Sequence, residues 1–293
     1  MLIHVSLAAR VGKSRVKRDQ VHLGAWTIFC DIAGHVSENP DNPIVTVAAV
    51  AVPPERIGHV RKRLLRAFDQ TPMKWKKGGL DGWSSVAHVI TRFDLPVAVS
   101  QLHRSGEAWT RFFAQARTCL EAAGERLVNK SAFTPDNVVR MLLLSRGFSG
   151  LTGRLIRSRY PWGALPATID IEEVADSDLK GPEAEELFKT SIAQWPDNSR
   201  LRGEFNVVPT ARARIATDDD EPLLLLPDYV AGLYHHADPR TRLFLPVVLP
   251  TDAEQAVLNF QTRMGKKLHE LPGDFDESYP LDHDDLGKVR VRD

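Results

Sequence analysis

Three aspartates and one lysine, far apart in the sequence, have the residue types that bind divalent cations and phosphates. Asp31 ends the apolar run "WTIFCD", Asp170 lies in "ATIDIEEV" with Glu172 two residues later, and Asp228 lies in "LLLLPDYVAG". Lys74 belongs to the basic stretch "MKWKK". Mg²⁺ and Mn²⁺ prefer carboxylate oxygens, and clustered carboxylates need such a cation to relieve their repulsion. If the fold brings these residues together, they could hold metal and stabilise a phosphate.

Each acidic residue also has a purely structural interpretation. Asp31 could start a turn, because an Asp side chain caps the backbone amides that follow it. Asp170 and Glu172 could lie on the solvated face of an edge strand. Asp228 could be an acid in the first turn of a helix that begins near Pro227, where the helix dipole stabilises it. A helix that begins earlier, after Glu221-Pro222, with a kink at Pro227, would remove that dipole effect. The sequence leaves these alternatives open.

Alternating strand and helix patterns predict the elements that must position these residues. Apolar and β-branched runs predict strands at 26–31, 44–52, 95–103 and 166–174, and extended structure at 202–216. Amphipathic spacing predicts helices at 55–70, about 82–92, 181–195 and 223–236. This alternation is typical of a layered α/β domain. Residues 107–160 have helical spacing and could form either an insertion or the crossover between two strands.

The overall composition restricts the partners. Lys plus Arg and Asp plus Glu both number 38, so the formal net charge is zero and only local basic patches could hold a polyanion such as nucleic acid. Within "KWKK", Lys74, Lys76 and Lys77 could contact phosphates while Trp75 offers a stacking face, or Trp75 could be anchored in the core. The chain has no apolar run long enough to span a bilayer, and its two cysteines lie in apolar patterns, which together favour a cytoplasmic protein.

Two further groups of residues are weaker candidates for metal binding. The adjacent histidines His235 and His236 would point about 100° apart on a helix, which disfavours a shared metal. The acidic stretches "DDDE" at 218–221 and "DHDD" at 282–285 are typical of solvated loops.

The order of the three aspartates resembles the pattern of RNase H-like nucleases: one ends the first strand, one lies in a later strand and one in a late helix. More specifically, the chain resembles the bacterial family numbered 3800 among domains of unknown function. The matching stretches are "DIAG" at 31–34, "PMKWKK" at 72–77, "ATID" at 167–170 and "LLLLPDYVAG" at 223–232. The resemblance covers residues 24–240. The chain departs from the family at Ile32 and Pro72, where the family has glutamate, and at Leu225, where it has glutamine.

The resemblance implies an α/β fold with an RNase H-like mixed central sheet flanked by helices and a helical insertion at about 107–160. The expected domain is 24–240, after a flexible basic leader at 1–23 and before a C-terminal extension at 241–293 whose polar tail begins near 273. In this resemblance Asp31, Asp170, Asp228 and Lys74 are the catalytic residues, and Asp31, Asp170, Glu172 and Asp228 hold Mg²⁺ or Mn²⁺. The implied activity is that of a Mg²⁺-dependent nuclease or phosphodiesterase that meets nucleic acid. The alternative is a catalytically degenerate binding or assembly protein of bacterial defence or mobile-element systems.

Overall fold

The structure is a computed structural model, and it describes most of the chain between residues 21 and 271. The described ranges are 21–38, 44–71, 73–103, 134–159, 167–176, 207–238 and 250–271, with scattered positions at 109–121 and 185–193. Nearly all of the expected basic leader and the polar tail lie outside these residues. The first strand begins at Val21, so the last three residues assigned to the leader belong to the sheet.

A six-stranded mixed sheet forms the centre of the fold, in the order β5-β4-β1-β2-β3-β6. Its strands are β1 (Val21–Ala33), β2 (Ile44–Val52), β3 (Val97–His103), β4 (Ala167–Asp176), β5 (Val207–Ala216) and β6 (Leu268–Glu270). The first three form an antiparallel meander, whereas β4 lies parallel to β1 on its other side and β5 lies parallel to β4. The ends of β1, β4 and β5 therefore meet at one edge of the sheet.

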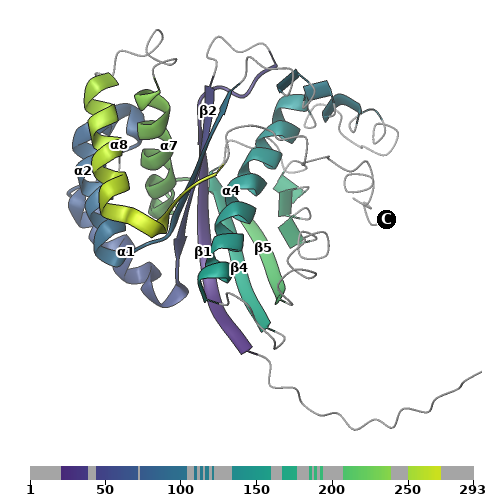
Figure 1. The fold of residues 1–293 in the computed structure, drawn as a ribbon, viewed down its shortest axis with the longest axis horizontal. Helices are drawn as coiled ribbons and strands as arrows, with labels where there is room; N and C mark the ends of the chain where they lie inside the picture. The colour runs from purple at the N-terminus through teal and green to yellow at the C-terminus, as the bar shows by residue number, and fades with distance from the viewer. Residues whose placement is uncertain are drawn as a thin grey trace, which may run out of the picture.

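Helices cover both faces of this sheet (Figure 1). On one side lie α1 (Pro54–Ala67), α2 (Trp75–Phe93), α7 (Leu225–Ala237) and α8 (Pro250–Met264), with α7 against β1 and β2. On the other side α4 (Pro135–Arg159) packs against β1, β2 and β3. The expected α/β class, with a mixed central sheet flanked by helices, is therefore confirmed. Among the described residues, none of the helices has both the length and the apolar character needed to cross a bilayer.

The described part of the 107–160 segment lies on the sheet as a crossover between β3 and β4, which run in the same direction. Thr134 caps the long helix of this segment, because the Thr134 hydroxyl accepts a hydrogen bond from the backbone N–H of Asn137 (3.3 Å). Pro135 then takes the first helical position, where its missing N–H costs nothing. For the residues that the structure describes, the crossover alternative is thus the one observed.

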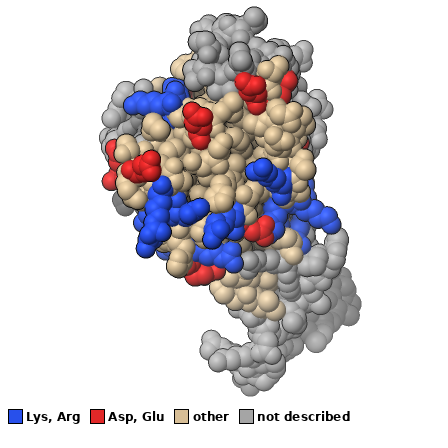
Figure 2. Space-filling model, turned by 90° about the vertical axis from the view of Figure 1, so that its left-hand side faces the viewer, with Lys and Arg blue, Asp and Glu red and all other residues tan. Residues whose placement is uncertain are grey.

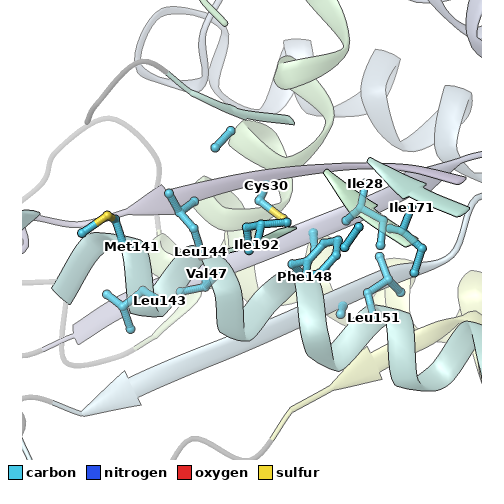
Figure 3. Packing of buried hydrophobic residues seen from close by; sticks show 14 of the residues in the cluster. Ile28, Cys30, Val47, Met141, Leu143, Leu144, Phe148, Leu151, Ile171 and Ile192 are labelled. Atoms are coloured by element: carbon cyan, nitrogen blue, oxygen red, sulfur yellow. The ribbon is translucent and has the colours of Figure 1, made fainter. Parts of the chain in front are cut away.

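Strand alternation along β1 sends its side chains into two separate cores. Ile28 and Cys30 point to the α4 side, whereas Phe29 points to the α7 side. Figure 3 shows Phe148 and Leu151 of α4 lying beside Ile28 in the first of these cores. Burying each such side chain stabilises the fold by about 1.5–3 kcal/mol relative to leaving it exposed. The same alternation places Asp31 on the α7 side.

One carboxyl group lies inside the α4-side core. Glu173 of β4 is fully buried, and neither of its carboxyl oxygens has a hydrogen-bond partner of normal geometry among the described residues. Burial raises the pKa of Glu173 to about 8, and the nearby Cys30 thiol, a weak donor, offsets only part of this rise. The folded protein therefore keeps Glu173 protonated at neutral pH.

We expect this group to make the protein less stable as the pH rises. The pKa of Glu173 is higher in the folded protein than its usual value of 4.5, so its contribution is fully present below pH 4.5 and is lost as the pH approaches 8. The free energy of unfolding should fall by about 1.4 kcal/mol per pH unit within this window. Urea unfolding of Glu173→Gln should show a flatter pH dependence and higher stability than wild type at pH 8.

The matched control is Glu172→Gln, because Glu172 is half-buried on the opposite face of the same strand. This variant should keep the wild-type slope with pH. Parallel stability curves for wild type and Glu173→Gln would show that Glu173 does not cause the slope.

Candidate functional site

Two aspartates lie side by side where β1 and β4 end. Cys30 of β1 pairs with Ala175 of β4, and Asp31 and Asp176 follow directly in each strand. Both point to the α7 side, as Phe29 and Val174 two residues before them do. Their exposed fractions are only 8% and 6%. Because neighbouring carboxylates repel each other in so buried a setting, they need a cation close by.

Asp228 reaches the same place from the first turn of α7. This helix begins at Leu225, after a short 3-10 turn, so Pro227 falls in the first turn, where a missing N–H does not interrupt the helix. The carboxylate of Asp228 accepts a hydrogen bond from the backbone N–H of Trp75 (2.7 Å). Burial raises the pKa of Asp228 to about 6, and the charge of Asp176 adds to the rise, whereas the Trp75 hydrogen bond and the charge of Lys74 oppose it. The acid therefore lies in a poorly solvated and strongly negative environment.

Lys74 supplies the positive charge among these acids. Its ammonium nitrogen lies 2.9 Å from a carboxylate oxygen of Asp176 and 2.6 Å from one of Asp218 in the loop after β5. The pKa of Lys74 is raised: burial favours the neutral amine, but the hydrogen bond and charge of Asp176, with the charges of Asp31 and Asp228, outweigh it. The side chain is still 48% exposed. One ammonium thus serves four carboxylates, a group that we call the aspartate cluster: Asp31, Asp176, Asp218 and Asp228.

Helices α2 and α7 are held in place by two aromatic rings that pack against glycines. The ring of Trp75 lies against Gly232 of α7, where a Cβ would overlap it. In return, the ring of Tyr229 lies with its hydroxyl against Gly78 and Gly82 of α2, where a Cβ would overlap that hydroxyl. The two rings meet edge to face, with centroids 5.7 Å apart. This packing fixes the Trp75 N–H opposite Asp228.

Gly79 allows α2 to begin as early as it does. Its backbone lies at φ 48° and ψ −139°, a conformation that is essentially restricted to glycine. The helical turn that carries Trp75 therefore meets the rest of α2 at a kink. The amphipathic spacing predicts a helix from about residue 82, whereas in the structure α2 begins at Trp75.

The structure brings together three of the residues that the sequence singled out and separates the others. Asp31, Lys74 and Asp228 join the aspartate cluster, but Asp170 pairs with Ala25 near the start of β1, six residues and about 20 Å before the end of β4. Asp170 is exposed and lies 3.9 Å from His22. The aspartate that β4 contributes to the site is therefore Asp176 and not Asp170.

Glu172 also lies apart from the cluster. Its carboxylate is 3.5 Å from Arg212 and 3.6 Å from Arg214 of β5, so it forms ion pairs on the sheet surface. The expected metal ligand at this position is therefore engaged by arginines.

Sequence reasoning missed Asp176 and Asp218. Asp176 shares a strand face with Asp170 at the two-residue period, but the predicted strand stopped at residue 174. Extending it to the next acid would have placed a carboxylate beside Asp31. Asp218 was assigned to a solvated loop, and only the fold shows that this loop follows the strand beside β4.

The proposed stacking role of Trp75 is wrong, and the core alternative is correct. Trp75 is 3% exposed, so no base could stack on it. The indole nitrogen of Trp75 lies 3.0 Å from Nδ1 of His236, and the same Nδ1 lies 2.8 Å from the carbonyl oxygen of Gly232. Burial lowers the pKa of His236, and the Gly232 contact opposes this shift. His236 thus contacts Trp75 rather than a metal.

The donor chemistry of the cluster suits Mg²⁺ or Mn²⁺, because its side chains offer hard carboxylate oxygens and more negative charge than Lys74 neutralises. In the described ranges, however, no three His, Cys, Asp or Glu side chains converge closely enough to form a metal site. The ammonium of Lys74 lies among the carboxylates instead. A cation could enter only if Lys74 released Asp176 and Asp218.

Comparisons with known proteins find similarity only to solved structures. No family model matches the sequence, and no curated protein matches it. One similar solved structure is a ribonuclease HIII in complex with Mn²⁺, with 14% sequence identity and a TM-score of 0.36. The alignment covers 84% of this chain and 65% of that chain. At this TM-score the similarity adds nothing to the argument for an activity.

The packing of Trp75 against Gly232 can be tested by adding one methyl group. We expect Gly232→Ala to lower the free energy of unfolding by about 1–3 kcal/mol, because the Trp75 ring must move out of its place. The matched control is Gly58→Ala on exposed α1, where a Cβ meets nothing within 4 Å and should stabilise the helix by up to about 1 kcal/mol. Denaturant unfolding measures both, and equal effects of the two substitutions would contradict the close approach.

Proposed function

We propose that the aspartate cluster is the active site of a divalent-cation-dependent phosphodiesterase that cleaves nucleic acid. The single observation that most supports this is the meeting of Asp31, Asp176 and Asp228 from β1, β4 and α7 around the ammonium of Lys74. A core does not need such a group, since buried carboxylates cost free energy unless a cation compensates them.

In this site the aspartates would bind the metal and the lysine would bind the phosphate. In this proposal Asp31, Asp176 and Asp228 would hold Mg²⁺ or Mn²⁺, which supplies Lewis acidity toward a phosphoryl oxygen when bound. The Trp75 N–H keeps the Asp228 carboxylate in one orientation (2.7 Å). Lys74, which is half-exposed, would turn from Asp176 to a non-bridging phosphate oxygen, and Asp218 would hold it when no substrate is present.

A second candidate function is that of a binding or assembly protein without catalysis. One observation favours it: the ammonium of Lys74 already compensates the cluster through its contacts with Asp176 and Asp218. In that case Lys74 replaces the metal permanently, and the cluster only joins α2 to the ends of β4 and β5. The two functions differ in how the protein responds to magnesium.

Substituting single carboxylates tests the catalytic proposal. With labelled DNA and RNA oligonucleotides and Mg²⁺ or Mn²⁺, we expect Asp31→Asn, Asp176→Asn and Asp228→Asn each to lower the cleavage rate by at least about a hundredfold. Asp170→Asn is the matched control, because Asp170 lies on the same strand as Asp176 but far from the cluster, and it should cleave at the wild-type rate. Equal cleavage by Asp176→Asn and wild type would exclude this site.

Removing the lysine separates the two candidate functions. Lys74→Met should lower the thermal unfolding midpoint, because it leaves the four carboxylates without their cation. For the enzyme we expect millimolar Mg²⁺ to restore the midpoint, since a ligand that binds only the folded protein stabilises it. Lys266→Met, at an exposed lysine in the 3-10 turn η2 (Gly265–Lys267) after α8, is the control and should not respond to Mg²⁺. A Lys74→Met midpoint that Mg²⁺ leaves unchanged would favour the scaffold.

A further inference from the structure

Positive charge is concentrated in one short part of this neutral chain. Residues 55–77 contain eight Lys or Arg and two Asp or Glu, although the whole sequence has equal numbers of both kinds. This stretch comprises α1, the following turn and the first residues of α2. The apolar side of α1 is buried through Val60 and Leu64, so its basic side chains lie on the outer side. Figure 2 shows Lys and Arg side chains gathered across the lower half of this helical layer.

Some of these cations have structural partners and some do not. Arg61 donates to both carboxylate oxygens of the buried Glu221 (2.8 Å), and Arg56 donates to the backbone carbonyl of Phe93 (3.1 Å). Five others form no ion pair with any residue that the structure describes, and we call them the α1 basic surface: Lys62, Arg63, Arg66, Lys76 and Lys77. All five are exposed. Their charge is therefore not balanced by an ion pair within the described residues, although the guanidinium of Arg63 lies 3.2 Å from Nε2 of His88.

The α1 basic surface extends to the aspartate cluster. Phe68, which ends α1, and Trp75, which begins α2, both lie against the ring of Tyr229 with centroids 5.7 Å away. The end of α1 is thus next to the start of α2. The positive charge of Lys76 lowers the pKa of Asp228, which places this lysine within electrostatic reach of the cluster. A chain of phosphates bound along α1 would therefore reach Lys74.

We propose that the α1 basic surface binds the phosphate backbone of a nucleic acid and guides one strand toward the aspartate cluster. The identity of this strand as substrate rests on the proposed function, but its binding does not require cleavage. Unpaired, exposed Lys and Arg side chains neutralise phosphates and release counterions, which gives affinity that depends on salt and little on sequence. The α1 basic surface would thus hold the phosphate backbone next to the aspartate cluster, whose own charge is negative.

Two features of the surface favour this partner over a membrane. An interfacial helix inserts Trp, Phe or Leu side chains into the lipid, but the apolar side of α1 is buried against the protein. The large apolar side chains that are exposed among the described residues are Met73 and Leu258, and neither belongs to α1. Anionic vesicles therefore serve as a contrasting ligand.

The experiment measures binding without catalysis. In EDTA, the fluorescence anisotropy of labelled 20-nucleotide DNA and RNA gives Kd for Asp31→Asn and for the same chain with Lys62→Gln and Arg66→Gln added. We expect the added substitutions to weaken binding about tenfold or more and to lower the slope of log K against log salt by about 2. The control pair is Arg154→Gln with Arg157→Gln on α4, which removes the same charge on the other side of the sheet and should leave Kd unchanged.

The outcomes separate this surface from the proposed activity. Weaker binding only in the variant with Lys62→Gln and Arg66→Gln supports the proposed role of the α1 basic surface, even if no variant cleaves nucleic acid. Equal binding by both pairs, or binding by neither parent nor variants, overturns the surface whatever the cleavage assay gives. Binding of phosphatidylserine vesicles that depends on Lys62 and Arg66, without binding of nucleic acid, also overturns it. Thermal unfolding of each variant checks that the chain is folded.

Discussion

The close approach of α2 and α7 is the constraint on which the rest of the site depends. Trp75 can lie against α7 only because residue 232 is a glycine, and Tyr229 can lie against α2 only because residues 78 and 82 are glycines. The two contacts fix the rotation of α2 about its axis and its position along that axis relative to α7. As a result the Trp75 N–H faces Asp228, and Lys74, the preceding residue, faces the ends of the strands.

Charge balance is the second consequence of this packing. The parallel pairing of β1 and β4 places Asp31 beside Asp176 in a buried position, which would be costly without a cation. The N-terminal end of α2 brings Lys74 to that point, and the loop after β5 adds Asp218 as a second partner. The cluster is therefore stable as it is and still more negative than one lysine can neutralise. These two properties correspond to the two functions considered for the chain.

Acidic residues on the two faces of the sheet have different surroundings. On the α7 side the acids meet a lysine and a backbone N–H, and Asp228 keeps a pKa of about 6. On the α4 side Glu173 lies in an apolar core beside the Cys30 thiol, and burial raises its pKa to about 8. Neighbouring residues of one strand, Glu172 and Glu173, thus differ in burial because alternate side chains point to opposite faces.

Local pattern was enough to predict the α/β class, five of the six strands and three members of the site, Asp31, Lys74 and Asp228. Such features depend on side-chain periodicity and on residue types that the sequence displays directly. The choice of Asp176 over Asp170 was not predictable in this way. Both acids lie on the same face of β4, and only the register between β1 and β4 decides which one lies beside Asp31.

The sequence by itself determined which residue types could carry charge and where most of the strands and helices form, because both follow from local chemistry. Only the tertiary structure decided that Trp75 is a core residue, that Asp218 meets Lys74 and that Glu172 faces arginines instead of the cluster. These contacts join residues from distant elements. Their distances depend on strand order and helix packing, which no local pattern specifies.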